Sequence, residues 1–254
     1  MWKKFSSILL TVLLCLACAV ASAQAAEDST PRAAAPQEKP SRIELVMILD
    51  RSGSMHGLEA DTIGGFNAMI EKEKKLGIDV RVTTVLFNDK IDRLYEHRAI
   101  QSVRPLTERT YETGGTTALL DAVGDTILRM EQSGAADRQG TKVIVVIITD
   151  GMENASHRYT YDKVKQMVER QKAKYGWEFL FLGANMDAIA AASDIGICAD
   201  RAVTYQSDQQ GTALNYEVLQ EAIHHVRTCA APLTGTWKDR IDADMRHREK
   251  RWSL

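Results

Sequence analysis

Three stretches of this 254-residue chain place side-chain oxygens next to apolar segments. The first is Asp-x-Ser-x-Ser directly after an apolar run, the second is Gly-Gly-Thr-Thr before an amphipathic segment, and the third is Thr-Asp-Gly after a run of branched apolar residues. Carboxylate and hydroxyl oxygens, without thiolate or imidazole, suit a hard cation: Mg²⁺, Ca²⁺ or Mn²⁺. Because hydroxyl ligands are neutral, an ion held by them keeps much of its charge and can bind an outside carboxylate. The residues that offer these oxygens are Asp50, Ser52, Ser54, Thr116, Thr117 and Asp150.

The segments around these residues alternate between strand and helix patterns. Short apolar runs rich in branched residues are typical of strands buried on both faces. Such runs predict strands at residues 43–49, 78–87, 143–148, 179–182 and 202–205. Amphipathic stretches predict helices at residues 58–75, 117–130, 161–174, 186–193 and 208–228. Strands separated by helices of this length indicate an α/β fold with a doubly wound, mostly parallel central sheet and helices on both faces.

Two local signals refine this picture. Asn88-Asp89 is typical of a tight turn, so residues 91–98 are predicted to form one antiparallel strand at the sheet edge. Gly64-Gly65 interrupts the helix predicted at 58–75, although glycine costs up to about 1 kcal/mol in a helix interior. We expect this pair to permit a close approach of the helix to the sheet.

The oxygen-bearing loops are expected to meet at one edge of the sheet. In open α/β sheets, ligands bind outside the carboxyl ends of the strands, at the point where the strand order reverses. If the strands at 43–49 and 143–148 are neighbours, all three loops converge there.

The combined motifs resemble the metal-ion-dependent adhesion site of von Willebrand factor type A domains, and the resemblance covers roughly residues 42–228. It implies that Ser52, Ser54 and Thr116 bind the metal directly, that Asp50 and Asp150 bind directly or through water, and that a partner supplies an acidic side chain. Thr116 is preferred to Thr117 because the family's threonine directly follows the glycine pair.

A narrower resemblance, to small bacterial single-domain proteins of this family without an assigned role, is carried by residues 49–55, 62–67, 115–122 and 175–184. Four further residues are candidates for contacts just outside the metal ligands: Thr117, Asp121, Glu153 and Asn154. For Asp121 the alternative is an acid that interacts with a helix dipole. For Glu153 and Asn154 the alternative is a turn that caps the following helix.

The chain divides into four predicted regions. Residues 1–23 have two lysines, a short apolar core and a small-x-small end, which predict a secretory signal peptide. Residues 24–41 form a Pro/Ala-rich linker, residues 42–230 the domain, and residues 231–254 an amphipathic C-terminal tail. We therefore expect an exported protein, periplasmic or secreted. Any membrane association would depend on a lipid anchor at Cys18, which we do not expect, or on the C-terminal tail.

Net charge excludes one class of function, and the cysteines raise the question of a disulfide. The chain has 32 basic and 34 acidic residues, which argues against a nucleic-acid binder. Cys198 and Cys229 are predicted to lie at the end of the sheet away from the metal loops. Export permits a disulfide between them, but the sequence leaves open whether one forms.

These observations predict a non-enzymatic, divalent-cation-dependent module that binds a protein partner. One alternative is a metal-dependent hydrolase, but an aspartyl phosphatase would have a second Asp at the position of Ser52. Gly-x-Ser-x-Gly surrounds neither Ser52 nor Ser54. The other alternative is a structural envelope scaffold with a vestigial metal site.

Overall fold

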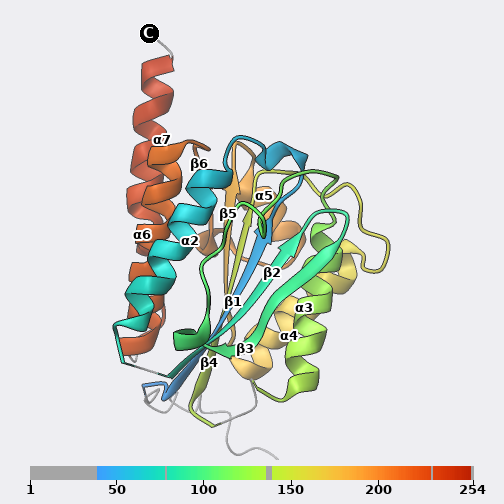
Figure 1. The fold of residues 1–254 in the computed structure, drawn as a ribbon, viewed down its shortest axis with the longest axis vertical. Coiled ribbons are helices and arrows are strands. Elements are labelled where there is room, and N and C mark those ends of the chain that lie inside the picture. Colours follow the sequence, from blue (N-terminus) through green and yellow to red (C-terminus); the bar gives the residue numbers. More distant parts are fainter. Residues whose placement is uncertain (1–38, 78, 136–138, 230, 253–254) are drawn as a thin grey trace, which may run out of the picture. The chain divides into compact units, whose positions relative to one another are not determined.

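The computed structural model describes residues 39–77, 79–135, 139–229 and 231–252 (Figure 1). The predicted signal peptide and residues 24–38 of the predicted linker lie outside these ranges. The strands are β1 (Arg42–Asp50), β2 (Asp79–Phe87), β3 (Ile91–Ala99), β4 (Thr141–Thr149), β5 (Glu178–Ala184) and β6 (Ala202–Tyr205). The α-helices are α2 (Glu59–Lys74), α3 (Leu119–Ser133), α4 (Tyr161–Tyr175), α5 (Ala188–Asp194), α6 (Gln209–Thr228) and α7 (Asp239–Trp252). Short 3-10 turns are η1 (Gly53–Met55), η2 (Ile100–Ser102), η3 (Ala199–Arg201) and η4 (Gly235–Lys238).

The strands form one sheet in the order β3-β2-β1-β4-β5-β6. All neighbouring strands are parallel except β3, which is antiparallel to β2 at the sheet edge. This arrangement confirms the predicted fold class. The strand order reverses between β1 and β4, which lie side by side in register, with Leu49 opposite Ile148.

Helices cover both faces of the sheet (Figure 1). Alternate residues of β1 point to opposite sides: Leu45 and Met47 contribute to the core under α2 and α6, whereas Val46 and Ile48 contribute to the core under α3 and α4. A strand that is buried on both faces has no polar alternation, which explains the continuous apolar runs in the sequence.

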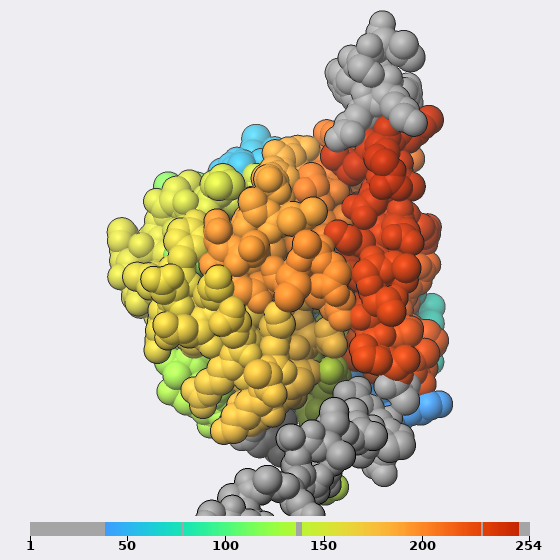
Figure 2. All heavy atoms as spheres, turned by 180° about the vertical axis from the view of Figure 1, so that it is seen from behind, coloured from blue at the N-terminus to red at the C-terminus, as the bar shows by residue number. Residues whose placement is uncertain are grey.

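The C-terminal helix α7 packs along β6 and α6 (Figure 2). Its Ile241 is 1% exposed and belongs to the core on the α2 and α6 side. Trp237, just before the helix, packs against the same core. This part of the predicted tail therefore packs on its own domain. Within the described ranges, we find no helix with the length and apolar character that a membrane span requires.

The glycine pair in α2 serves a helix-helix contact, not the predicted helix-sheet contact. A Cβ atom on Gly65 would lie 2.0 Å from the Cδ2 atom of Tyr216 in α6. A Cβ atom on the neighbouring Gly64 would have no atom within 4 Å. Only one glycine of the pair is therefore required for packing.

Substituting the two glycines by alanine should have opposite effects. Gly65→Ala overpacks the α2–α6 contact and should lower the free energy of unfolding by about 1–3 kcal/mol. Gly64→Ala adds a helix-favouring residue at an exposed position and should raise it, by up to about 1 kcal/mol. Chemical denaturation of both variants checks this pair. Equal destabilisation by both substitutions would contradict the packing explanation.

Candidate metal-binding site

The three oxygen-bearing loops meet at the carboxyl ends of β1 and β4. Asp50 is the last residue of β1, and Asp150 directly follows β4. The segment before α3 joins the first loop through backbone hydrogen bonds from Gly53 N to Gly115 O (3.0 Å) and from Gly114 N to Arg51 O (2.9 Å). The adjacency of β1 and β4 thus produces the convergence that the motif spacing predicted.

Hydroxyls and carboxylates form a continuous cluster in this place. The Asp50 carboxylate accepts hydrogen bonds from the backbone N–H of Ser52 (2.7 Å) and from the Thr149 hydroxyl (2.5 Å). The hydroxyl oxygens of Ser52 and Ser54 lie 3.1 Å apart, and Ser54 donates to Asp150 at 2.5 Å. Asp50 is fully buried and Ser52 is 1% exposed. These residues are therefore held in fixed orientations at the base of the loops.

The threonine whose hydroxyl faces the cluster in the structure is Thr117, whereas the family resemblance favoured Thr116. A Cβ atom placed on Gly151 would lie 2.8 Å from the Thr117 hydroxyl, 3.2 Å from that of Ser54 and 3.5 Å from that of Ser52. These three hydroxyls thus surround one point. Thr117 is 2% exposed, whereas Thr116 is an exposed residue.

The backbone around Thr117 explains this orientation. Its N–H donates to the Asn154 side-chain oxygen at 2.9 Å, and its carbonyl accepts from the Asn154 N–H at 3.0 Å. Ala118 N–H donates to the carbonyl of Asn88. Because the Thr117 carbonyl accepts from the loop, the first helical carbonyl is that of Ala118, which accepts from the Ala122 N–H. Helix α3 therefore begins at Leu119 and not at the predicted residue 117.

The other residues considered near the metal lie against the backbone. Glu153 accepts from the Leu120 N–H at 2.8 Å, and Asp121 accepts from backbone N–H groups of the loop after β4. Glu153 and Asn154 therefore hold the start of α3, while the following helix α4 is capped by Thr160. Thr149, the hydroxyl donor to Asp50, was not predicted from the sequence. The signal available was a polar last residue directly after the six apolar residues 143–148 of the strand.

Burial disfavours the charged form of both carboxyl groups in the site. Burial raises the pKa of Asp50 to about 6, although hydrogen bonds from Thr149 and Ser52 act to lower it. Burial likewise raises the pKa of Asp150, against the hydrogen bond from Ser54. Arg51, inside the first loop, pairs with Asp92 of β3. A hard divalent cation would neutralise both carboxylates and use the neighbouring hydroxyls as ligands, so the donor set fits such an ion.

The described ranges hold no second candidate metal site built from cysteine, histidine or acidic side chains. No group of three or more His, Cys, Asp or Glu side chains that could hold a metal occurs there. A metal site in this part of the chain would therefore depend on hydroxyl ligands besides the two carboxylates.

The two cysteines lie at the opposite end of the sheet, as the sequence predicted. Cys198 and Cys229 line one groove of about 560 Å³, beside the starts of β4 and β5. Both thiols are free and exposed in the structure. The Lys172 ammonium lies 3.3 Å from the Cys198 sulfur.

Comparison with known proteins identifies the family. A family model described as von Willebrand factor type A domain matches residues 44–218. The chain belongs to this family. No match was found among the curated proteins.

Solved structures share the fold of this von Willebrand factor type A domain. The vWF domain of the type V pili tip protein Mfa5 from Porphyromonas gingivalis has a TM-score of 0.55 and 11% identity, over 78% of this chain and 99% of that chain. The D319A mutant of the PilB minor pilin from Streptococcus sanguinis has a TM-score of 0.54 and 12% identity, over 78% of this chain and 65% of that chain. The proximal thread matrix protein 1 from the mussel byssus has a TM-score of 0.51 and 12% identity, over 72% of this chain. The match spans only 46% of the mussel protein.

Proposed function

We propose that this von Willebrand factor type A domain binds a protein partner through a divalent cation, Mg²⁺ or alternatively Ca²⁺ or Mn²⁺. Membership of the family supports a protein-interaction module. The observation that carries the cation is the arrangement of the Ser52, Ser54 and Thr117 hydroxyls around one point, beside the carboxylates of Asp50 and Asp150.

The chemistry of this donor set supports capture of a carboxylate. Three of the five side chains are neutral hydroxyls, which offset none of the ion's positive charge. Ions of this kind take six or more oxygen ligands, which leaves room for water or an outside oxygen. An Asp or Glu side chain of the partner would take such a position. The surrounding loops would then select among partners that offer one.

We propose binding without turnover. A hydrolase needs a nucleophile or a general base beside the reacting atom. The hydrogen bonds to the Asp50 and Asp150 side chains come from the Ser52 backbone N–H and from the Ser54 and Thr149 hydroxyls. In the described contacts these hydroxyls are not paired with a histidine. We also propose export to the periplasm or the cell exterior, on the basis of the N-terminal sequence. The pilus proteins among the structural neighbours are consistent with that environment.

The two adjacent threonines provide a matched test of the metal site. Thermal unfolding of the purified protein is measured in EDTA and then in millimolar Mg²⁺, Ca²⁺ or Mn²⁺. At about 100 times Kd, an ion should stabilise the protein by roughly 2.7 kcal/mol, a rise of a few degrees in Tm. Thr117→Val should lose this response, whereas Thr116→Val should keep it.

Other outcomes point to different conclusions. No response of the wild-type protein to any of the three ions would favour the structural scaffold. Metal-dependent hydrolysis of a phosphate ester that Thr117→Val abolishes would favour the hydrolase. Binding of a partner is tested by a pull-down in Mg²⁺, which should be released by EDTA and absent for Thr117→Val.

A further inference from the structure

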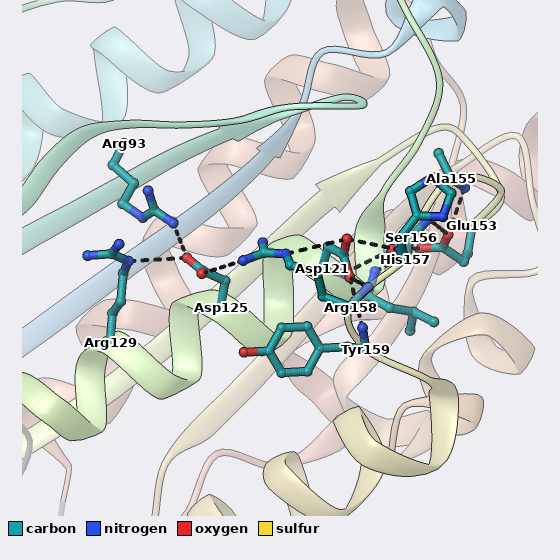
Figure 3. A network of polar contacts seen from close by, with 11 residues as sticks. Arg93, Asp121, Asp125, Arg129, Glu153, Ala155, Ser156, His157, Arg158 and Tyr159 are labelled. Atoms are coloured by element: carbon teal, nitrogen blue, oxygen red, sulfur yellow. Dashed lines mark hydrogen bonds and ion pairs between the residues drawn. The ribbon is translucent and has the colours of Figure 1, made fainter.

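The loop that follows Asp150 is fastened to helix α3 by one buried carboxylate (Figure 3). Asp121 accepts hydrogen bonds from three consecutive backbone N–H groups: those of His157 (3.0 Å), Arg158 (2.9 Å) and Tyr159 (2.9 Å). Asp121 is 7% exposed, so these bonds are largely shielded from water. Because they bind main-chain atoms, they fix the path of the loop itself.

A second carboxylate ties the other half of the same loop to the same turn of α3. Glu153 accepts from the N–H groups of Leu120 (2.8 Å), Ala155 (2.9 Å) and Ser156 (2.7 Å). The Ser156 hydroxyl donates to Glu153 at 2.8 Å and accepts from the Asp121 N–H at 2.9 Å. Two N–H groups in the first turn of α3, those of Leu120 and Asp121, are therefore bonded to side chains of the loop.

The two segments that these contacts connect, the start of α3 and the loop after Asp150, each adjoin a proposed metal ligand. Thr117 lies two residues before α3, and its main chain pairs with Asn154 of the loop in both directions. Asp150 immediately precedes the loop. The contacts thus connect Thr117 and Asp150 through the loop backbone.

We propose that Asp121 is a positioning residue for the metal site: by holding the loop backbone, it sets the distance between the Thr117 and Asp150 oxygens. This inference rests on the proposed function. Although burial acts to raise it, the three backbone N–H groups and Arg158 lower the pKa of Asp121 below its usual value. Asp121 is therefore charged at neutral pH, and its bonds to the loop are charge-assisted.

Asp125, one turn further along α3, provides a matched control. It is also 7% exposed, but it contacts only side chains in the described network: those of Arg93, Arg129 and Arg158 (Figure 3). Its removal takes away buried ion pairs without releasing the loop backbone. The two aspartates thus separate an effect on the metal site from a general loss of stability.

The experiment compares the affinity of Asp121→Ala, Asp125→Ala and the wild-type protein for Mn²⁺ alone, with free Mn²⁺ measured by electron paramagnetic resonance. It is carried out well below the Tm of each variant, which is recorded in parallel. Groups that orient metal ligands from outside typically change affinity 10- to 100-fold. We expect Asp121→Ala to weaken Mn²⁺ binding about 10-fold or more, and Asp125→Ala to change it less than about 3-fold, although both lower Tm.

Asp121→Asn completes the design, since it keeps one oxygen acceptor and carries the test if the alanine variant does not fold. Its affinity should lie between those of the wild type and Asp121→Ala, or below the wild type if Asp121→Ala is unfolded. Wild-type affinity in either Asp121 variant would overturn the proposal, as would an equal loss in Asp125→Ala. Failure of the wild-type protein to bind Mn²⁺, Mg²⁺ or Ca²⁺ is a separate outcome, which overturns the proposed function itself.

Discussion

Replacing Asp50 by asparagine should make the metal-free protein more stable at neutral pH, while abolishing its stabilisation by divalent ions. Burial raises the pKa of Asp50 from 3.8 to about 6. Ionising this buried group in the folded protein therefore costs about 3 kcal/mol above pH 6, at about 1.4 kcal/mol for each unit of pKa shift. Asparagine is uncharged and avoids this cost, but it also removes a carboxylate ligand.

The pH dependence gives this prediction its sign. Since the folded protein holds the Asp50 proton more tightly than the unfolded chain, the contribution of Asp50 to stability is fully present below about pH 4. It is lost as the pH rises through about 6. Near pH 4, the unfolding free energy of Asp50→Asn should therefore equal or fall below that of the wild type. As the pH rises to 7, the unfolding free energy of the variant should increase relative to that of the wild type.

Denaturant unfolding in EDTA at several pH values between 4 and 7.5 measures this difference. Other carboxyl groups titrate in both proteins, so the difference between variant and wild type isolates Asp50. Millimolar Mg²⁺ should stabilise the wild type most above pH 6 and leave the variant unchanged. If the stability of Asp50→Asn relative to the wild type fell as the pH rises, burial would not raise the pKa of Asp50.

Removing the guanidinium of Arg227 should destabilise the protein by about 3–5 kcal/mol, because it leaves a buried carboxylate without a partner. Arg227 in α6 lies 3.1 Å from Glu73 in α2, and their side chains are 3% and 0% exposed. Within the described residues, the second carboxylate oxygen of Glu73 has no hydrogen-bond partner. Burial raises the pKa of Glu73 although Arg227 acts to lower it. The loss in Arg227→Met should therefore be smaller at acid pH, where Glu73 takes up a proton.

The double variant Glu73→Leu, Arg227→Met is the control for this pair. Replacing both buried charges by apolar side chains of similar volume is often neutral or stabilising. The double variant should thus regain most of the stability that Arg227→Met loses. Guanidinium unfolding at pH 7 measures this difference. If the double variant were as unstable as the single variant, loss of packing, and not an unpaired charge, would explain the effect.

The boundaries of the elements show where local sequence signals are sufficient. The strand predicted at 143–148 is the centre of β4, and the helix predicted at 208–228 is α6 with its cap residue Asp208. Both follow from apolar periodicity and from a side chain that bonds the nearest free N–H groups. The start of α3 was predicted two residues early, because both the N–H and the carbonyl of Thr117 bond to Asn154 of a distant loop.

That early helix start and the choice of Thr116 have one physical origin. A residue inside a helix has its direction set by neighbours in the chain, whereas Thr117 is oriented by a loop that follows β4. The sequence could therefore indicate a threonine next to the glycine pair but not which hydroxyl faces the cluster. The same holds for Gly65, whose contact is Tyr216 of α6 and not the sheet.

The sequence by itself determined the order of strands and helices, the antiparallel edge strand and the chemical type of the candidate ligands. These depend on side-chain chemistry and on periodicities that span a few residues. Only the tertiary structure decided that β1 and β4 are neighbours, that Thr117 completes the hydroxyl cluster, and that Asp121 holds the loop after Asp150. Those features depend on groups brought together from separate parts of the chain, and a hydrogen bond between distant segments leaves no signature in the local residue pattern.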